Sequence, residues 1–126
     1  FSRLDERRVG KNYLKNLHIA RLDFCERNDI PWGWLELLMW LYDMEFFTMD
    51  YVSKNYGINK KNLADRMIYP MVNSGYMYKH FDKLTPSDTA EDHLFRDETK
   101  YNYRVRYAIT QKARMTVQRF YNYLES

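Results

Sequence analysis

The chain of 126 residues has few residues that break regular structure and almost none that could cross-link it. It contains 4 glycines and 3 prolines, which argues against a disordered chain and against an all-β protein with many turns. The single cysteine, Cys25, cannot form a disulfide within the chain, and this favours a reducing compartment such as the cytoplasm. No apolar run is long enough to span a membrane, so we expect no membrane partner.

Apolar and aromatic side chains, in contrast, are abundant. Hydrophobic residues make up 45% of the chain, with 12 Tyr, 7 Phe and 3 Trp, so one domain with a substantial core is expected. The net charge of +3 is compatible with a nucleic-acid partner but does not require one. Positive charge is concentrated toward the C-terminal end, because residues 82–100 carry a net charge of −3 whereas residues 101–120 contain five basic and no acidic residues.

The sequence has no recognisable catalytic or metal-binding pattern. The three histidines, His18, His80 and His93, lie far apart, and no cluster of Cys and His has the spacing of a zinc site. There is no glycine-rich phosphate loop, no Gly-x-Ser-x-Gly and no His-Glu-x-x-His. We therefore expect neither an enzyme nor a bound cofactor or metal.

Hydrophobic periodicity predicts helices near both ends of the chain. Residues 4–27 form a long amphipathic pattern that Asn28-Asp29-Ile30-Pro31 should end. Residues 32–42 are apolar on nearly all sides, which is typical of a short buried helix. A last helix is expected over 111–124. The apolar stripes of the first and last helices are Val9, Tyr13, Leu17, Ala20 and Phe24, and Ala113, Val117, Phe120 and Leu124.

Two helices joined by a turn are predicted in the middle of the chain. Thr48 is a suitable N-cap for a helix over 49–56, and Gly57 suits the residue after it, where φ is positive. Asn59 is a suitable N-cap for a second helix over 60–73. Pro70 lies inside this helix, so we expect a kink or bulge over 66–70. The four-residue spacing of Leu63, Met67 and Met71 places them on one face.

Two β-strands are predicted after these helices. Residues 76–81 are rich in aromatics, and residues 103–109 alternate with a period of two. Tyr103, Val105, Tyr107 and Ile109 should face the core, and Arg104, Arg106 and Ala108 should face outward. The connection over 82–101 is long for a hairpin. Within it, Asp88 and Glu91 could cap a short helix that runs through Phe95.

In this order of elements the chain resembles the MarR-type family of winged helix-turn-helix transcriptional regulators. The resemblance rests on three segments: Thr48–Leu63 with Val52, Tyr56, Ile58 and Leu63 in the apolar positions; Ser74-Gly75-Tyr76-Met77; and Tyr107–Arg114, with Ala113 where Gly is common. The chain departs from the family in a longer interval between Gly57 and Gly75, in a long acidic wing loop and in the absence of the usual Asp and Arg at the wing tip.

The resemblance implies a mainly α (α+β) fold that forms a single winged-helix domain over 1–126. Residues 1–30 and 111–126 would be dimerisation helices, and 46–110 a DNA-binding lobe with a two-stranded wing and an extended wing loop over 82–101. Such a protein would bind double-stranded DNA as a homodimer at a pseudo-palindromic site and regulate transcription. A small-molecule effector between the dimer helices and the lobe is also implied, although the cluster of Trp32, Trp34, Trp40, Phe46 and Phe47 is better explained as core than as a ligand pocket.

Candidate DNA contacts follow from the side of the second helix that faces away from Leu63, Met67 and Met71. Asn62 could bind adenine, and Lys61 or Arg66 could bind guanine, whereas Asp65 repels phosphate unless it accepts a hydrogen bond from cytosine. Lysines and arginines nearby would bind phosphate. The predicted DNA-binding residues are Lys54, Asn59, Lys60, Lys61, Asn62, Arg66, Lys79, Arg104 and Arg106.

Two alternatives remain open. Ordinary solvated charges would explain the same lysines and arginines. The acidic wing loop, Asp65 and the modest net charge also suit a winged helix that binds other proteins in a larger assembly.

Cys25 would be an oxidant sensor if its thiol had a low pKa and were accessible. The competing interpretation is a partly buried, inert thiol.

Overall fold

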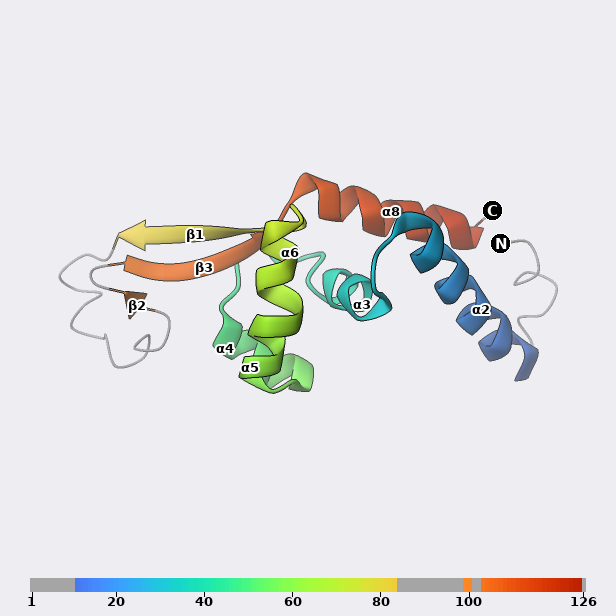
Figure 1. Cartoon of the computed structure of the whole chain (residues 1–126), viewed down its shortest axis with the longest axis horizontal. Coiled ribbons are helices and arrows are strands. Elements are labelled where there is room, and N and C mark those ends of the chain that lie inside the picture. The colour runs from blue at the N-terminus through green and yellow to red at the C-terminus, as the bar shows by residue number, and fades with distance from the viewer. Residues whose placement is uncertain (1–10, 84–98, 101–102, 126) are drawn as a thin grey trace. The chain divides into compact units, whose positions relative to one another are not determined.

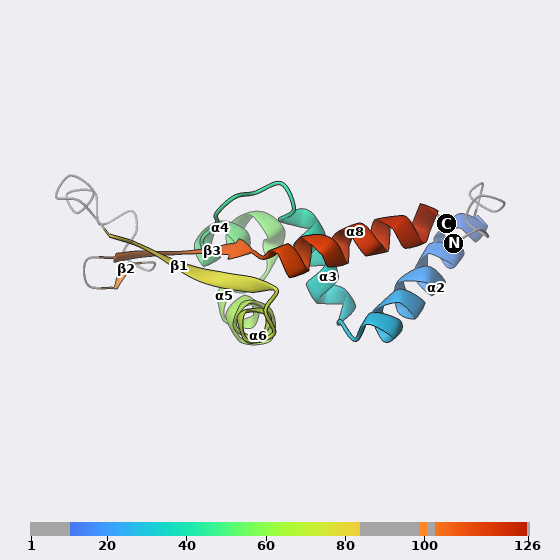
Figure 2. The same cartoon turned by 90° about the horizontal axis from the view of Figure 1, so that it is seen from above.

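The computed structural model describes residues 11–83, 99–100 and 103–125. The chain divides into two compact units, 1–42 with 112–126, and 43–111. The elements are drawn in Figures 1 and 2 and are, in chain order, α2 (Lys11–Asn28), α3 (Trp32–Trp40), α4 (Met49–Val52), η1 (Ser53–Gly57), α5 (Lys60–Leu63), η2 (Ala64–Ile68), α6 (Tyr69–Asn73), β1 (Met77–Lys83), β2 (Thr99–Lys100), β3 (Tyr103–Ile109) and α8 (Gln111–Glu125). The predicted mainly α (α+β) class is confirmed at this coarse level.

The first unit is built from α2, α3 and α8, whose apolar faces form its core. Phe24 and Phe120 pack edge to face, with ring centroids 5.0 Å apart, and Trp32 packs against Phe120 at 5.6 Å. Such contacts contribute beyond the burial of their area. The predicted stripe of the last helix is only partly buried, because Val117 and Leu124 are half-exposed while Thr116 is buried. The Thr116 hydroxyl donates to the carbonyl of Lys112, so a polar residue could take an inward position.

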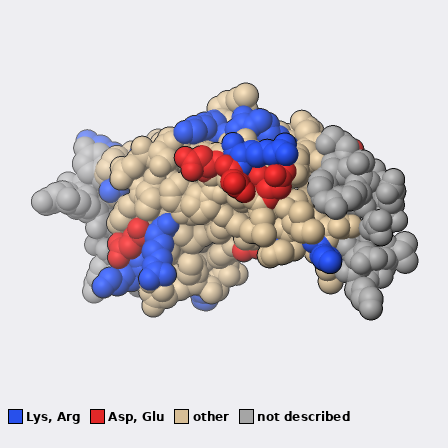
Figure 3. Space-filling view, turned by 45° about the vertical axis from the view of Figure 1, so that its right-hand side comes forward, with Lys and Arg blue, Asp and Glu red and all other residues tan. Residues whose placement is uncertain are grey.

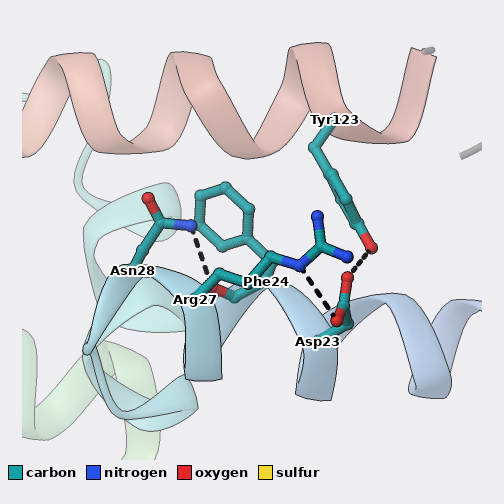
Figure 4. Close-up of polar contacts among 5 residues, drawn as sticks. All are labelled: Asp23, Phe24, Arg27, Asn28 and Tyr123. Carbon is teal, nitrogen blue, oxygen red and sulfur yellow. Dashed lines mark hydrogen bonds and ion pairs between the residues drawn. The ribbon is translucent and has the colours of Figure 1, made fainter.

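Polar contacts also join α2 to α8, as Figure 4 shows. The Tyr123 hydroxyl donates to Asp23 Oδ2, and Arg27 Nε lies 3.2 Å from Asp23 Oδ1. At the end of α2 the Asn28 side chain donates to the carbonyl of Phe24 at 2.9 Å, and Asp29 has a φ of 51°. The predicted end of the first helix in this segment is therefore confirmed.

Cys25 lies on α2 and is half-buried. Burial raises the pKa of its thiol, and the nearby charge of Arg21 lowers it by less, so the pKa lies above its ordinary value. A reactive cysteine needs the opposite shift. The geometry therefore supports the interpretation of Cys25 as an inert thiol.

The second unit contains an antiparallel sheet with strand order β1-β3-β2. The register of β1 and β3 runs from Met77 opposite Ile109 to Lys83 opposite Tyr103. On the other edge of β3, Phe47 and Tyr107 exchange two backbone hydrogen bonds of 2.9 and 2.8 Å. Strand β3 is therefore central, and β1 lies at an edge of the sheet.

The strands correct three expectations. The first strand extends to Lys83 rather than ending at Phe81, and Thr99–Lys100 pairs with β3, so the connection is shorter than 82–101. Asp82 lies opposite Arg104 and forms an ion pair with Arg106, which favours continued pairing. Ala108 is buried rather than exposed, so this end of β3 is covered on both faces: Ala108 is buried on one, and Tyr107 and Ile109 are buried on the other. The short helix predicted through Phe95 lies outside the described residues.

Candidate nucleic-acid interface

The two short helices of the second unit each begin at a residue whose side chain caps the helix, and a glycine turn separates them. Thr48 Oγ1 accepts a hydrogen bond from the backbone N–H of Tyr51 at 3.1 Å. Gly57 has a φ of 84°, a conformation that favours glycine. Asn59 Oδ1 accepts from the N–H groups of Lys61 and Asn62, at 2.9 and 3.2 Å. The two predicted N-caps and the predicted glycine turn are therefore confirmed.

The first helix of the pair is less regular than predicted. It is α-helical over Met49–Val52 and then widens over Ser53–Gly57, where the N–H of Ile58 bonds the carbonyl of Ser53 at 3.2 Å. The Ser53 hydroxyl donates to the carbonyl of Ile58 at 2.6 Å, which closes the turn from the other side. A wide last turn places Gly57 where its positive φ reverses the chain.

The second helix contains a wide turn, Ala64–Ile68, between α5 and α6. Pro70 follows this turn and has no N–H for an α-helical hydrogen bond to the carbonyl four residues earlier, which explains the irregularity. The predicted bulge near 66–70 is therefore confirmed. In a regular α-helix a four-residue spacing drifts by about 40° per step. A turn closed by an i→i+5 hydrogen bond contains more residues than an α-helical turn, which offsets this drift. Leu63, Met67 and Met71 therefore all stay buried.

The opposite side of this helix presents a row of exposed side chains that differ in chemistry. Asn62 and Arg66 are four residues apart, as are Lys61 and Asp65, so each pair occupies neighbouring turns. The row combines an amide, two cations and one carboxylate, and Tyr69 extends it toward α6. These groups include the donors and acceptors that can bind the edges of base pairs.

Two predicted DNA-binding residues at the start of the second helix already have partners within the chain. Lys60 Nζ lies 2.6 Å from Asp50 Oδ1, which joins the first helix to the second. Asn59 Oδ1 is occupied by the helix N–H groups, so only the amide nitrogen of Asn59 is left to donate. Lys54, in η1, is exposed.

The predicted wing arginines are not presented as exposed cations. Arg106 Nε lies 2.5 Å from Asp82 Oδ2 in an ion pair that is not aligned as a hydrogen bond, and the Arg106 guanidinium lies 4.4 Å from the centre of the Phe46 ring. His80 Nε2 is 2.8 Å from Asp82 Oδ1, and the His80 and Phe46 rings are 4.9 Å apart. Arg104 is half-buried. The expectation that Arg106 and Arg104 extend freely toward phosphate therefore needs correction, because β-sheet pairing places both beside Asp82.

The electrostatics of Asp82 reflect this cluster, which consists of Phe46, His80, Asp82 and Arg106. Partial burial raises the pKa of Asp82, but the close contacts and charges of Arg106 and His80 lower it by more. The pKa of Asp82 therefore lies below its ordinary value. The carboxylate remains charged and paired at neutral pH, and it offsets part of the positive charge of Arg104 and Arg106 on this face of the hairpin.

The other face of β1 carries a pattern that sequence reasoning did not single out. Lys79, Phe81 and Lys83 are exposed and alternate with the residues of the Asp82 cluster along the strand. Lys79 Nζ lies 5.4 Å from the centre of the Phe81 ring, which is 53% exposed. Of these three residues only Lys79 was predicted as a DNA contact. The two-residue spacing of Lys, Phe and Lys was the available indication.

Charge elsewhere on the surface is mixed. On the face drawn in Figure 3, the clusters of Lys and Arg lie beside Asp and Glu rather than forming one broad basic surface. Within the described part of the chain, no three His, Cys, Asp or Glu residues are grouped so that they could hold a metal ion. None of the helices in that part combines the length and the apolar character that crossing a membrane requires.

The predicted site residues thus fall into two groups within the second unit. Lys54, Asn59, Lys60, Lys61, Asn62 and Arg66 lie on the paired helices, and Lys79, Arg104 and Arg106 lie on the strands. The helix group presents at least Lys61, Asn62 and Arg66 together on one exposed side. Comparison of the chain with protein-family models, with curated proteins and with solved structures found no match.

Proposed function

We propose that the protein binds double-stranded DNA in a sequence-specific manner and regulates transcription as a homodimer. One observation carries the proposal: the second of two capped helices buries Leu63, Met67 and Met71 and leaves Lys61, Asn62 and Arg66 exposed on its other side. This is the arrangement that a helix-turn-helix needs, since the recognition helix must be anchored on one side and polar on the other.

Each exposed residue has a base partner suited to its chemistry. The Asn62 amide can donate to and accept from adenine, and the Arg66 guanidinium can donate twice to guanine. Lys61 offers a second donor for guanine. Asp65, four residues after Lys61, would accept from the amino group of cytosine, so its charge restricts the sequence rather than only weakening binding.

Phosphate contacts would be fewer than the number of basic residues suggests. Lys60 is paired with Asp50 and Arg106 with Asp82, whereas Lys54 and Lys79 are exposed. Each phosphate contact adds about −0.9 to the slope of log affinity plotted against log salt concentration. We therefore expect moderate salt dependence, with sequence discrimination supplied mainly by the helix.

The proposed homodimer rests on the MarR-type resemblance. In that family the terminal helices of two copies pair, and the two recognition helices then enter successive major grooves of a pseudo-palindromic site. Exposed apolar residues on α2 and α8, among them Leu14, Leu22 and Met115, provide surface that a second copy could cover.

The proposal is tested by selecting bound sequences from random duplexes. The wild-type protein should enrich a pseudo-palindromic site, and Lys61→Ala with Arg66→Ala should abolish the enrichment. A control with Lys83→Ala on β1 removes an exposed cation that is neither a predicted duplex contact nor part of the terminal helices, and it should still enrich the site. If wild-type protein binds duplex no better than a neutral protein does at low salt, DNA regulation is excluded. A monomer at micromolar concentration would exclude the dimer separately.

A second candidate function is a winged helix that binds another protein in a larger assembly. The internal pairing of Lys60 with Asp50 and of Arg106 with Asp82 favours it, because these pairs remove two cations that a DNA-binding surface would use. The two functions differ in salt dependence. Protein binding through the same helix should persist at salt concentrations that dissociate a protein–DNA complex.

A further inference from the structure

The exposed face of β1 that carries Lys79, Phe81 and Lys83, here termed the Lys-Phe-Lys face, has a composition that neither base readout by the helix nor core packing explains. Phe81 is 53% exposed although it lies opposite Val105, which is 9% exposed. A large aromatic side chain left in water on a regular strand loses the free energy that its burial would give. The two flanking residues on the same face are exposed lysines.

The acidic residue of β1, Asp82, does not lie on this face. Successive side chains of a strand point to opposite faces, so Asp82 lies on the side away from Lys79, Phe81 and Lys83. There Asp82 is held by Arg106 and His80. The Lys-Phe-Lys face is therefore positively charged, and the carboxylate nearest to it in sequence does not oppose an anionic ligand.

We propose that the Lys-Phe-Lys face binds single-stranded DNA, with an unpaired base stacked on the Phe81 ring and backbone phosphates bound by Lys79 and Lys83. Aromatic side chains beside cations are the usual means of binding single strands without strict sequence preference. Lys79 Nζ lies over the Phe81 ring, 5.4 Å from its centroid, so its flexible side chain would move aside as a base stacks and would bind the adjacent phosphate. The face needs only a base with an open π-surface and a nearby phosphate.

A duplex suits this face less well. Bases within a duplex are already stacked on both sides, so Phe81 could reach them only by separating a base step, which costs a few kcal/mol. An unpaired strand offers its bases without that cost. The choice of DNA rather than RNA rests on the proposed function, because the helices of the same unit are proposed to bind duplex DNA.

The test is fluorescence anisotropy of a labelled oligothymidine with the full chain. Phe81→Ala should weaken binding about 5- to 150-fold, the range measured for loss of one stacked base. Phe81→Trp should retain binding. The matched control is Tyr78→Ala, which removes another exposed aromatic ring from β1 but on the opposite face, and it should leave affinity unchanged. Lys79→Ala with Lys83→Ala should reduce the salt slope by about 1.4.

Several outcomes would overturn the proposal. These are no binding of oligothymidine at low salt, equal loss with Tyr78→Ala and Phe81→Ala, or tenfold tighter binding of oligouridine than of oligothymidine. Binding of phosphatidylserine vesicles that depends on Phe81, without binding of the oligonucleotide, would also overturn it. The protein variant with Lys61→Ala and Arg66→Ala separates the two proposals, because it should lose duplex binding and keep oligothymidine binding. Retained oligothymidine binding without wild-type duplex binding would refute only the proposed regulator, and the reverse would refute only the Lys-Phe-Lys face.

Discussion

Lys60 Nζ lies 2.6 Å from Asp50 Oδ1, so the first residue of the second helix is joined to the first turn of the helix before it. The side chains are 40% and 47% exposed, so the pair contributes little to folding, about 1 kcal/mol or less. Its larger consequence concerns the proposed DNA binding, because Asp50 pairs with a cation that the proposed interface would otherwise offer to phosphate.

Asp50→Asn should therefore strengthen duplex binding while leaving stability nearly unchanged. Release of Lys60 adds one phosphate contact, so the salt slope should steepen by about 0.9. Anisotropy titrations at several salt concentrations measure the slope, and urea denaturation measures stability. Asp43→Asn removes the same charge from another exposed position of the second unit and serves as control. An equal effect of both variants would indicate net charge rather than release of Lys60.

Asn59 provides a way to separate a capping role from a DNA-binding role. Asn59→Ala should lower the free energy of unfolding by about 1 kcal/mol, because Lys61 and Asn62 lose the acceptor of their N–H groups. Asn59→Asp should keep the cap and most of the stability but weaken duplex binding, since it adds a negative charge at the proposed interface. Denaturation and anisotropy on both variants test this. If Asn59→Asp binds duplex as well as wild type, Asn59 is a cap alone.

Asp82 predicts a pH dependence of stability. Its folded-state pKa is lowered by Arg106 and His80 beyond the opposing effect of burial, whereas in the unfolded chain it should be close to about 3.9. The stabilisation is therefore fully present above that value and is lost as pH falls through the lower folded-state pKa. The difference in unfolding free energy between wild type and Asp82→Asn should be constant near neutrality and shrink below about pH 4. Urea denaturation across this range measures it, and a difference that grows as pH falls would contradict the assignment.

Tyr123 tests the contact between α2 and α8 that Figure 4 shows. Tyr123→Phe keeps the ring, whose centroid is 5.7 Å from that of Phe24, and removes only the hydroxyl that donates to Asp23. Stability should fall by about 1 kcal/mol. A double-mutant cycle with Asp23→Asn should give a coupling energy of at least about 0.5 kcal/mol, and additive effects would show that the hydroxyl contributes nothing through Asp23.

Local chemistry made the caps and the bulge predictable. Thr48, Gly57 and Asn59 act through backbone groups within a few residues, and Pro70 acts through its own missing N–H, so sequence spacing alone was sufficient. The same holds for Val105, Tyr107 and Ile109, which are buried as the alternation in β3 predicts, but not for Ala108. That residue is buried because of what covers the sheet, which an alternating pattern does not encode.

The candidate site was less predictable because it depends on side chains from separate elements. Asp50 and Lys60 are ten residues apart in sequence, and Asp82 reaches Arg106 only through strand register. Composition gives the number of cations but not the number that are paired. The Lys-Phe-Lys face was missed for a related reason: Phe81 was expected in an aromatic strand, and whether its face is covered depends on tertiary packing.

The pairing of Phe47 with Tyr107 has a consequence for how the protein is organised as a module. These residues lie near the two ends of the 43–111 unit, and their reciprocal hydrogen bonds bring the ends together. When the two ends of a segment lie close together, the segment can be inserted into a host protein or removed from it without distorting the segment or the host. Residues 43–111 therefore have the layout of a cassette carried between α3 and α8, one that could be transplanted into an unrelated scaffold through a single pair of junctions.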